Sequence, residues 1–334
     1  MQSTAKRDVL TKSVFGSRIA EDDVDLEAYF VETEQWRKVL AGDVDIVFGA
    51  KGAGKSALYS LLVAQKDQMR LGRRTIFLAA ENPRGTPAFR DLAADPPVTE
   101  EQFRGLWKLY FLALAAQYMQ VQLDHSKTHS AAASQVISFL TQNDLLAPNV
   151  SLISRLKSVL AYIRNHLPAF EGSVVEPNTG ISLKGKITLA EPTPEQRGNG
   201  HRSLDELLTL LDEAYVGQKI TVWLILDRLD VAFTDSSILE GNALRSLFRT
   251  YLDMVGLSNI AMKIFLRDDI WKKIITSGFR EASHITRTTT LAWDHQTLQN
   301  LIVRRLVSNE ILCKLFEVDK EGVLTNEKLQ TQFF

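Results

Sequence analysis

The fold of this chain is decided by one short stretch, Gly49-Ala50-Lys51-Gly52-Ala53-Gly54-Lys55-Ser56. It matches the pattern G-x-x-x-x-G-K-S in full. The apolar run Asp43–Phe48 precedes it and predicts a buried strand, and the spacing of apolar residues over Ala57–Met69 predicts a helix. Glycines let backbone N–H groups converge on phosphate oxygens, and the N-terminus of the next helix adds a partial positive charge. The stretch therefore predicts a phosphate-binding loop, and a chance glycine-rich turn would lack this context.

The loop also predicts which of its groups contact a nucleotide and a metal. Lys55 should reach the β- and γ-phosphates, and the Ser56 hydroxyl should coordinate Mg²⁺. We expect the nucleotide phosphates to be held by Gly49, Lys51, Gly52, Ala53, Gly54, Lys55, Ser56 and Ala57.

A second apolar run ends in a carboxylate. Ile220–Leu226 predicts a buried strand, and Asp227 follows it directly. Asp227 would hold Mg²⁺ directly or through water, and the plainer alternative is a turn or helix-cap residue. Arg228 comes next, where many ATPases with a phosphate-binding loop have a glutamate that orients water. Asp230 therefore either takes over that role or is a turn residue, in which case hydrolysis is slow.

Other polar residues near strand ends are candidates for contacts with the nucleotide. Arg267 follows the expected strand Ala261–Leu266 and would either sense the γ-phosphate as a catalytic residue or pair with a neighbouring aspartate. Arg304 and Arg305 would fold over the nucleotide or lie on a solvated helix face. If Asp230 does not position the water, Glu81 is the next carboxylate to consider.

Strands and helices alternate before residue 80 and after residue 201, which predicts an α/β fold with a parallel sheet. The aromatic stripe Trp107, Tyr110, Phe111 and Tyr118 must pack on the core or form a recognition surface. We divide the chain into an N-terminal helical lead-in (1–40), a nucleotide-binding core (41–80 and 201–293), a mostly helical insertion (81–200) with a loop or hairpin at 171–200, and a C-terminal helical lid (294–334).

The amino-acid composition excludes several classes of protein. The 334 residues include 39 basic and 40 acidic side chains, and the formal net charge is −1, so nucleic-acid binding would need a local patch such as Lys184-Gly185-Lys186. The single cysteine, Cys313, excludes a disulfide framework and a cysteine-based zinc cluster. The longest apolar run, Leu109–Ala116, is too short to span a membrane. We expect a cytoplasmic protein without a membrane segment.

Four blocks occur in the same order as in a known family: Phe48–Leu62, Leu224–Asp230, Phe265–Trp271 and Leu291–Leu306. Together they resemble bacterial STAND-type and AAA+-like P-loop ATPases. The stretch Phe15–Trp36 resembles a subgroup of stand-alone P-loop ATPases. The resemblance implies an ASCE-type core, with a strand added between the loop strand and the aspartate strand. It also implies ATP rather than GTP as the ligand.

The resemblance further implies a switch or an oligomer driven by the nucleotide, in regulation or bacterial antiviral defence. We expect partners to be further copies of the chain, a separate effector protein, or both, and we expect the lid to be truncated or the effector to be a separate chain. Arg228 departs from the family pattern and puts fast turnover in doubt. A DNA-handling ATPase, of the loader or origin-binding type, is the main alternative, and a nucleotide kinase is a third.

Overall fold

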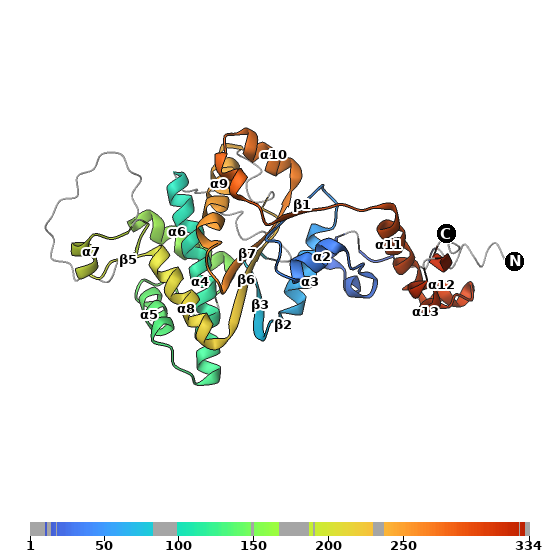
Figure 1. The fold of residues 1–334 in the computed structure, drawn as a ribbon, viewed down its shortest axis with the longest axis horizontal. Coiled ribbons are helices and arrows are strands. Elements are labelled where there is room, and N and C mark those ends of the chain that lie inside the picture. Colours follow the sequence, from blue (N-terminus) through green and yellow to red (C-terminus); the bar gives the residue numbers. More distant parts are fainter. Residues whose placement is uncertain are drawn as a thin grey trace.

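A mixed six-stranded sheet forms the centre of the molecule (Figure 1). The computed structural model describes residues 11, 15–17, 19–82, 99–147, 150–166, 187–189, 191–229, 237–326 and 328–330. In spatial order the strands are β2 (Asp67–Arg70), β3 (Arg73–Ala79), β6 (Ile220–Leu226), β7 (Ile260–Arg267), β1 (Ile46–Gly49) and β8 (Thr288–Leu291). All neighbouring pairs are parallel except β2 and β3. The α/β fold is confirmed, and the sheet is parallel, as predicted, except at this edge.

The antiparallel edge explains why the helix after the loop is shorter than predicted. Helix α3 spans Lys55–Gln65, and Met69 lies in β2 instead of on the helix. Leu71 (φ 49°) and Gly72 (φ 73°) are both left-handed and join paired residues Arg70 and Arg73. Two left-handed residues in a two-residue loop are the requirement of a tight hairpin turn, so the chain folds back here as a hairpin.

Side chains of the central strands alternate between two separate cores. On β6, Val222, Leu224 and Leu226 join one cluster of buried residues, whereas Trp223 and Ile225 join the other. Residues on both faces are therefore buried, as in a parallel sheet covered by helices on both sides.

Helices cover both faces of the sheet (Figure 1). Helices α2 (Glu34–Leu40) and α3 pack on the face that carries Trp223 and Ile225. The opposite face is covered by α4 (Glu100–Ser126), α8 (Leu204–Gln218) and α9 (Ser237–Met254). Outside α4 lie α5 (Ala131–Gln142) and α6 (Leu152–His166), and α10 (Asp268–Thr276) and the 3₁₀ turn η4 (Arg280–His284) follow β7.

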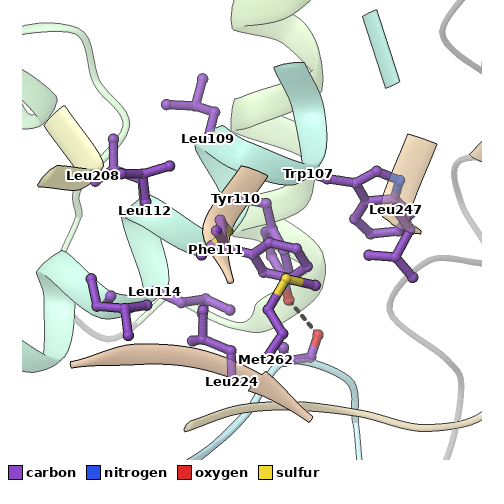
Figure 2. Packing of buried hydrophobic residues seen from close by; sticks show 14 of the residues in the cluster. Trp107, Leu109, Tyr110, Phe111, Leu112, Leu114, Leu208, Leu224, Leu247 and Met262 are labelled. Carbon is purple, nitrogen blue, oxygen red and sulfur yellow. Dashed lines mark hydrogen bonds between the residues drawn. The ribbon is translucent and has the colours of Figure 1, made fainter. Parts of the chain in front are cut away.

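Helix α4 belongs to the core although the sequence places it in an insertion. Trp107, Tyr110 and Phe111 are fully buried, and Figure 2 shows Tyr110 and Phe111 beside Met262 of β7 and Trp107 beside Leu247 of α9. The Tyr110 hydroxyl donates to the carbonyl of Ala80 at 2.8 Å, drawn as the dashed line. Parallel strands need a crossover connection, and α4 lies on the path from β3 to β6. The aromatic stripe therefore packs on the core.

The expected loop or hairpin at 171–200 lies partly outside the described residues, which omit 167–186 and 190. The described part forms a parallel pair, β4 (Ile187–Thr188) with β5 (Arg202–Ser203), and the short helix α7 (Pro194–Gly198) connects them. The residues expected to form the loop or hairpin, 181–186 among them, lie outside the described residues, so that expectation stays a prediction.

The described residues before β1 and after β8 form short helices and turns. In the described part of the expected helical lead-in (1–40), the chain forms the 3₁₀ turns η1 (Ala20–Asp22) and η2 (Leu26–Tyr29), then α2. Helix α2 begins late because the Thr33 side chain caps it, accepting from the Trp36 N–H at 3.2 Å. After β8 come α11 (His295–Val307), α12 (Glu310–Leu315) and α13 (Lys320–Thr325). None of the helices in the described ranges is long and apolar enough to cross a membrane.

Candidate functional site

The glycine-rich loop connects β1 to α3 at the carboxyl end of the sheet. Gly52 (φ 84°) and Gly54 (φ 98°) have left-handed backbones, which glycine adopts without a Cβ clash. Gly54 is the N-cap of α3, and its carbonyl accepts from the N–H groups of Ala57 and Leu58. The loop therefore ends on the N-terminus of a helix, where N–H groups and the helix dipole favour an anion.

Lys55 is held against this loop. Its side chain is buried, and its ammonium donates to the carbonyls of Gly49 and Ala50, both at 2.9 Å. The positive charge is thereby held against the carbonyls of the loop, and its predicted contact with phosphate stays a prediction.

The hydroxyl predicted to bind Mg²⁺ lies beside the predicted carboxylate. Ser56 Oγ donates to Asp227 Oδ2 at 2.6 Å, across 171 residues of sequence. Asp227 is 4% exposed. It follows β6 on the face that carries Trp223 and Ile225, and this is the face covered by α3. The structure thus brings together the loop and the end of the aspartate strand.

This pair has the donor chemistry that Mg²⁺ prefers, a hydroxyl oxygen and a carboxylate oxygen. The described residues contain no group of three or more His, Cys, Asp or Glu that could hold a metal ion. Mg²⁺ in phosphoryl-transfer sites is commonly held by one or two protein oxygens together with substrate phosphates and water. Ser56 and Asp227 therefore fit an ion that arrives with a phosphate ligand.

The chain turns sharply directly after Asp227. Arg228 has φ 59°, a left-handed backbone that is unusual for a residue with a long side chain. Asp230, the carboxylate predicted to orient water, lies outside the described residues. Its role stays a prediction.

Glu81 lies at the neighbouring strand end and is 0% exposed. Its Oε1 accepts from the N–H of Asn82 at 2.6 Å, and its backbone carbonyl accepts from the Tyr59 hydroxyl at 2.5 Å. Sequence analysis treated Glu81 only as a substitute for Asp230. Its closeness to the site follows from strand pairing, which the local sequence does not show.

Arg267 lies at the strand end where the sequence predicts it, and its side chain pairs with a neighbouring aspartate. It is the last residue of β7 and pairs in register with Gly49 of β1. Its guanidinium makes a two-pronged ion pair with Asp269, at 3.0 and 2.6 Å. Through this hydrogen bond, Arg267 lowers the pKa of the Asp269 carboxyl. The backbone position fits a sensor, but these bonds direct the side chain to Asp269.

A cavity of about 290 Å³ lies beside the loop. Its wall combines the N-terminal segment, the loop and the C-terminal helix α11, through Phe30, Gly54, Trp293 and Leu298 among others. Trp293 Nε1 donates to the carbonyl of Ala53 at 2.9 Å, which ties the segment after β8 to the loop. Sequence analysis missed Trp293, because an aromatic residue after a strand carries no distinctive signal.

The two arginines of α11 have different surroundings. Arg305 lines the cavity, donates to the carbonyl of Phe15 at 3.0 Å and lies over the Tyr29 ring at 4.7 Å from its centre. Arg304 instead bonds to Asn300 at 3.0 Å. Of the two, Arg305 is therefore the residue that joins α11 to the N-terminal segment beside the cavity.

Comparison of the chain with family models, with curated proteins and with solved structures gave no match.

Proposed function

We propose that this chain binds ATP together with Mg²⁺ and is a slow P-loop ATPase. The proposal is carried by one observation, the 2.6 Å hydrogen bond from Ser56 to Asp227. A hydroxyl from the glycine-rich loop and a carboxylate from another strand meet where the pattern G-x-x-x-x-G-K-S requires a metal site. The strand order supports the same proposal, because β7 lies between β1 and β6 as an ASCE-type core implies.

Each group then has a physical role. Backbone N–H groups of residues 49–57 and the Lys55 ammonium would bind the phosphates, and Ser56 and Asp227 would hold Mg²⁺. The metal would neutralise charge that develops on the phosphate oxygens. The protein contributes position and electrostatic stabilisation, which is most of what phosphoryl transfer requires.

The cavity beside the loop suits the base of the nucleotide. Aromatic and aliphatic side chains dominate its wall, and an apolar slot with a few polar groups is the usual site for a planar ligand. One wall is α11 and another is the N-terminal segment, so a bound base would contact both. We therefore propose that nucleotide binding fixes α11 relative to the core. This contact would let the chain act as a nucleotide-dependent switch or assembly module, with itself or with an effector protein.

Calorimetric titration of the full chain with Mg-ATP and Mg-GTP tests the binding proposal. We expect wild type to bind ATP, and Lys55→Ala to weaken the affinity by about tenfold or more, since a charge-assisted bond to phosphate is lost. Lys272→Ala, at an exposed lysine of α10, is the matched control and should bind as wild type does. Unchanged ATP affinity in Lys55→Ala would remove the basis of the site assignment.

Light scattering after size-exclusion chromatography, with and without ATP, tests the switch. We expect the molar mass of the particle to increase when ATP is added, either to the chain alone or to the chain mixed with an effector protein. If the mass is unchanged while DNA binding falls steeply with salt, the DNA-handling alternative replaces the switch.

The proposed place of the switch in bacterial antiviral defence comes from the family resemblance alone. It is tested by phage challenge of cells that carry the wild-type gene or Lys55→Ala.

A further inference from the structure

We propose that Glu81 is the catalytic base that orients and deprotonates the attacking water, in place of a carboxylate directly after Asp227. This inference rests on the proposed function, because it concerns hydrolysis at the same site.

The first support is the strand register. Ala79 pairs with Ile225 in the parallel ladder of β3 and β6, and the Ala80 N–H donates to the Ile225 carbonyl at 2.8 Å. Glu81 and Asp227 each lie two residues beyond this pair. Alternate residues of a strand point to the same face, and neighbouring strands are about 4.8 Å apart. The two carboxylates therefore end adjacent strands on the same face of the sheet.

The second support is that α3 contacts both strand ends from its first turns. Ser56 bonds to the Asp227 carboxylate, and three residues later the Tyr59 hydroxyl bonds to the Glu81 backbone at 2.5 Å. Tyr59 is fully buried. Burial and the nearby carboxylates of Glu81 and Asp227 raise the pKa of the Tyr59 hydroxyl far above its ordinary value. Helix α3 thus contacts the ends of both strands through Ser56 and Tyr59.

The third support is the residue after Asp227. An arginine side chain has no acceptor for a proton from water, so Arg228, the residue after Asp227, cannot act as the base. Its left-handed backbone also turns the chain away from the line of β6. The Glu81 carboxylate follows the adjacent strand β3, so its position does not depend on this turn.

The proposed step balances as follows. The oxygen of a water molecule forms a bond to the γ-phosphorus while one water proton passes to the Glu81 carboxylate. The bond between the γ-phosphorus and the β–γ bridging oxygen breaks, and that oxygen keeps the electron pair as ADP leaves. No oxidant or further reactant is needed.

A purely structural role for Glu81 makes a different prediction. Its Oε1 accepts from the Asn82 N–H, so the side chain could serve only to cap the end of β3. Glutamine keeps an acceptor oxygen at the same position but cannot take a proton at neutral pH. Glu81→Gln therefore preserves the cap and removes the base.

The test uses the full chain of wild type, Glu81→Gln and the control Glu213→Gln, which changes an exposed residue of α8. Three quantities are measured: Mg-ATP affinity by calorimetry, phosphate release, and the identity of the nucleotide extracted from protein incubated with ATP. We expect Glu81→Gln to bind Mg-ATP with an affinity within about threefold of wild type. Its rate of phosphate release should be lower by at least about 100-fold. Extraction should yield ATP from Glu81→Gln and mainly ADP from wild type.

The other outcomes separate the two proposals. Phosphate release by Glu81→Gln within threefold of wild type overturns the role of Glu81 and leaves the proposed ATPase intact. Wild type that binds ATP without hydrolysing it also overturns the inference, but not nucleotide binding. Wild type that does not bind ATP overturns both.

Discussion

At the amino end of β1, Asp45 is surrounded by donors, whereas at the carboxyl end of β6 the buried Asp227 faces a loop. Asp45 accepts from Lys263 Nζ at 2.7 Å, from Arg287 Nε at 2.6 Å and from the Tyr251 hydroxyl at 3.0 Å. Burial alone would raise the pKa of the Asp45 carboxyl, but the two cations hold it below its usual value. These contacts join β1, β7, α9 and the start of β8, so we assign Asp45 to fold stability.

At the carboxyl end of the sheet, the backbone near Asp227 differs from the backbone near Asp45. Asp227 bonds to a hydroxyl at the start of a helix, next to a loop that contains left-handed glycines. Both aspartates are buried, at 5% exposed for Asp45 and 4% for Asp227. Burial of a charge therefore does not by itself indicate a functional site. The glycine-rich loop and the helix N-terminus distinguish the two ends, and this distinction makes predictions.

The largest expected effect is a loss of stability at the amino end. Asp45→Asn removes the negative charge opposite the buried Lys263, and breaking a buried ion pair costs about 3–5 kcal/mol. The free energy of unfolding from urea denaturation checks this value. Folded Asp45→Asn should still bind Mg-ATP with wild-type affinity. A loss below about 1 kcal/mol, or a selective loss of ATP binding, would erase the contrast between the two ends.

The second prediction is the pH dependence of the same cluster. Because the pKa of Asp45 is lower in the folded state than its ordinary value of 3.8, the folded state binds this proton less readily. The stabilisation is present above about pH 4 and is lost as the pH falls through the folded-state pKa. Unfolding free energy should therefore decline more steeply in acid for wild type than for Asp45→Asn. Equal slopes for the two proteins would contradict this role.

The third prediction concerns the backbone of the loop. A Cβ at Gly52 would meet no atom within 4 Å, so Gly52→Ala adds only the strain of a left-handed backbone, about 1–2 kcal/mol. Gly256, where a Cβ also meets open space but the backbone is not left-handed, is the matched control. We expect Gly52→Ala to lower both stability and ATP affinity and Gly256→Ala to lower neither. If the two variants behave alike in calorimetry and denaturation, the loop geometry is not important.

The smallest expected effect compares two serines one turn apart on α3. Ser56→Ala removes the donor to Asp227 and should lower the free energy of unfolding by about 1 kcal/mol. The ATP affinity of this variant should also lose its dependence on Mg²⁺. Ser60 Oγ is buried without a hydrogen-bond partner in the described part of the chain, so Ser60→Ala should be neutral or slightly stabilising. ATP titrations with Mg²⁺ and with EDTA measure the difference. A Ser56→Ala variant with full Mg²⁺ dependence would count against the proposed metal ligand.

The sequence predicted the parts of the molecule that depend on neighbouring residues. The loop pattern places Lys55 and Ser56 at the start of the helix that follows the loop, because its glycines and helix start are local features. The apolar run before Asp227 likewise predicts a buried strand. The structure brings Ser56 and Asp227 into contact, and the metal role expected of both residues stays a prediction.

The parts that were missed depend on residues far apart in the chain. The register that places Glu81 beside Asp227 joins strands about 150 positions apart, and nothing around Glu81 encodes it. Helix α4 was interpreted as an insertion because a long connection hides its role as the crossover between β3 and β6. The hairpin at Leu71 and Gly72 is a local feature, but the apolar spacing over Ala57–Met69 favours a helix across it.

The claim that the carboxyl end of the sheet is the ligand site is tested most directly by hydrogen exchange of backbone amides, followed by mass spectrometry. The full chain is compared with and without Mg²⁺ and a non-hydrolysable ATP analogue. We predict slower exchange in peptides that cover residues 49–58 and 226–229, and no change in peptides that cover 43–45 and 258–262. Slower exchange only at the amino end, or none at the loop while the analogue is bound, would contradict the account.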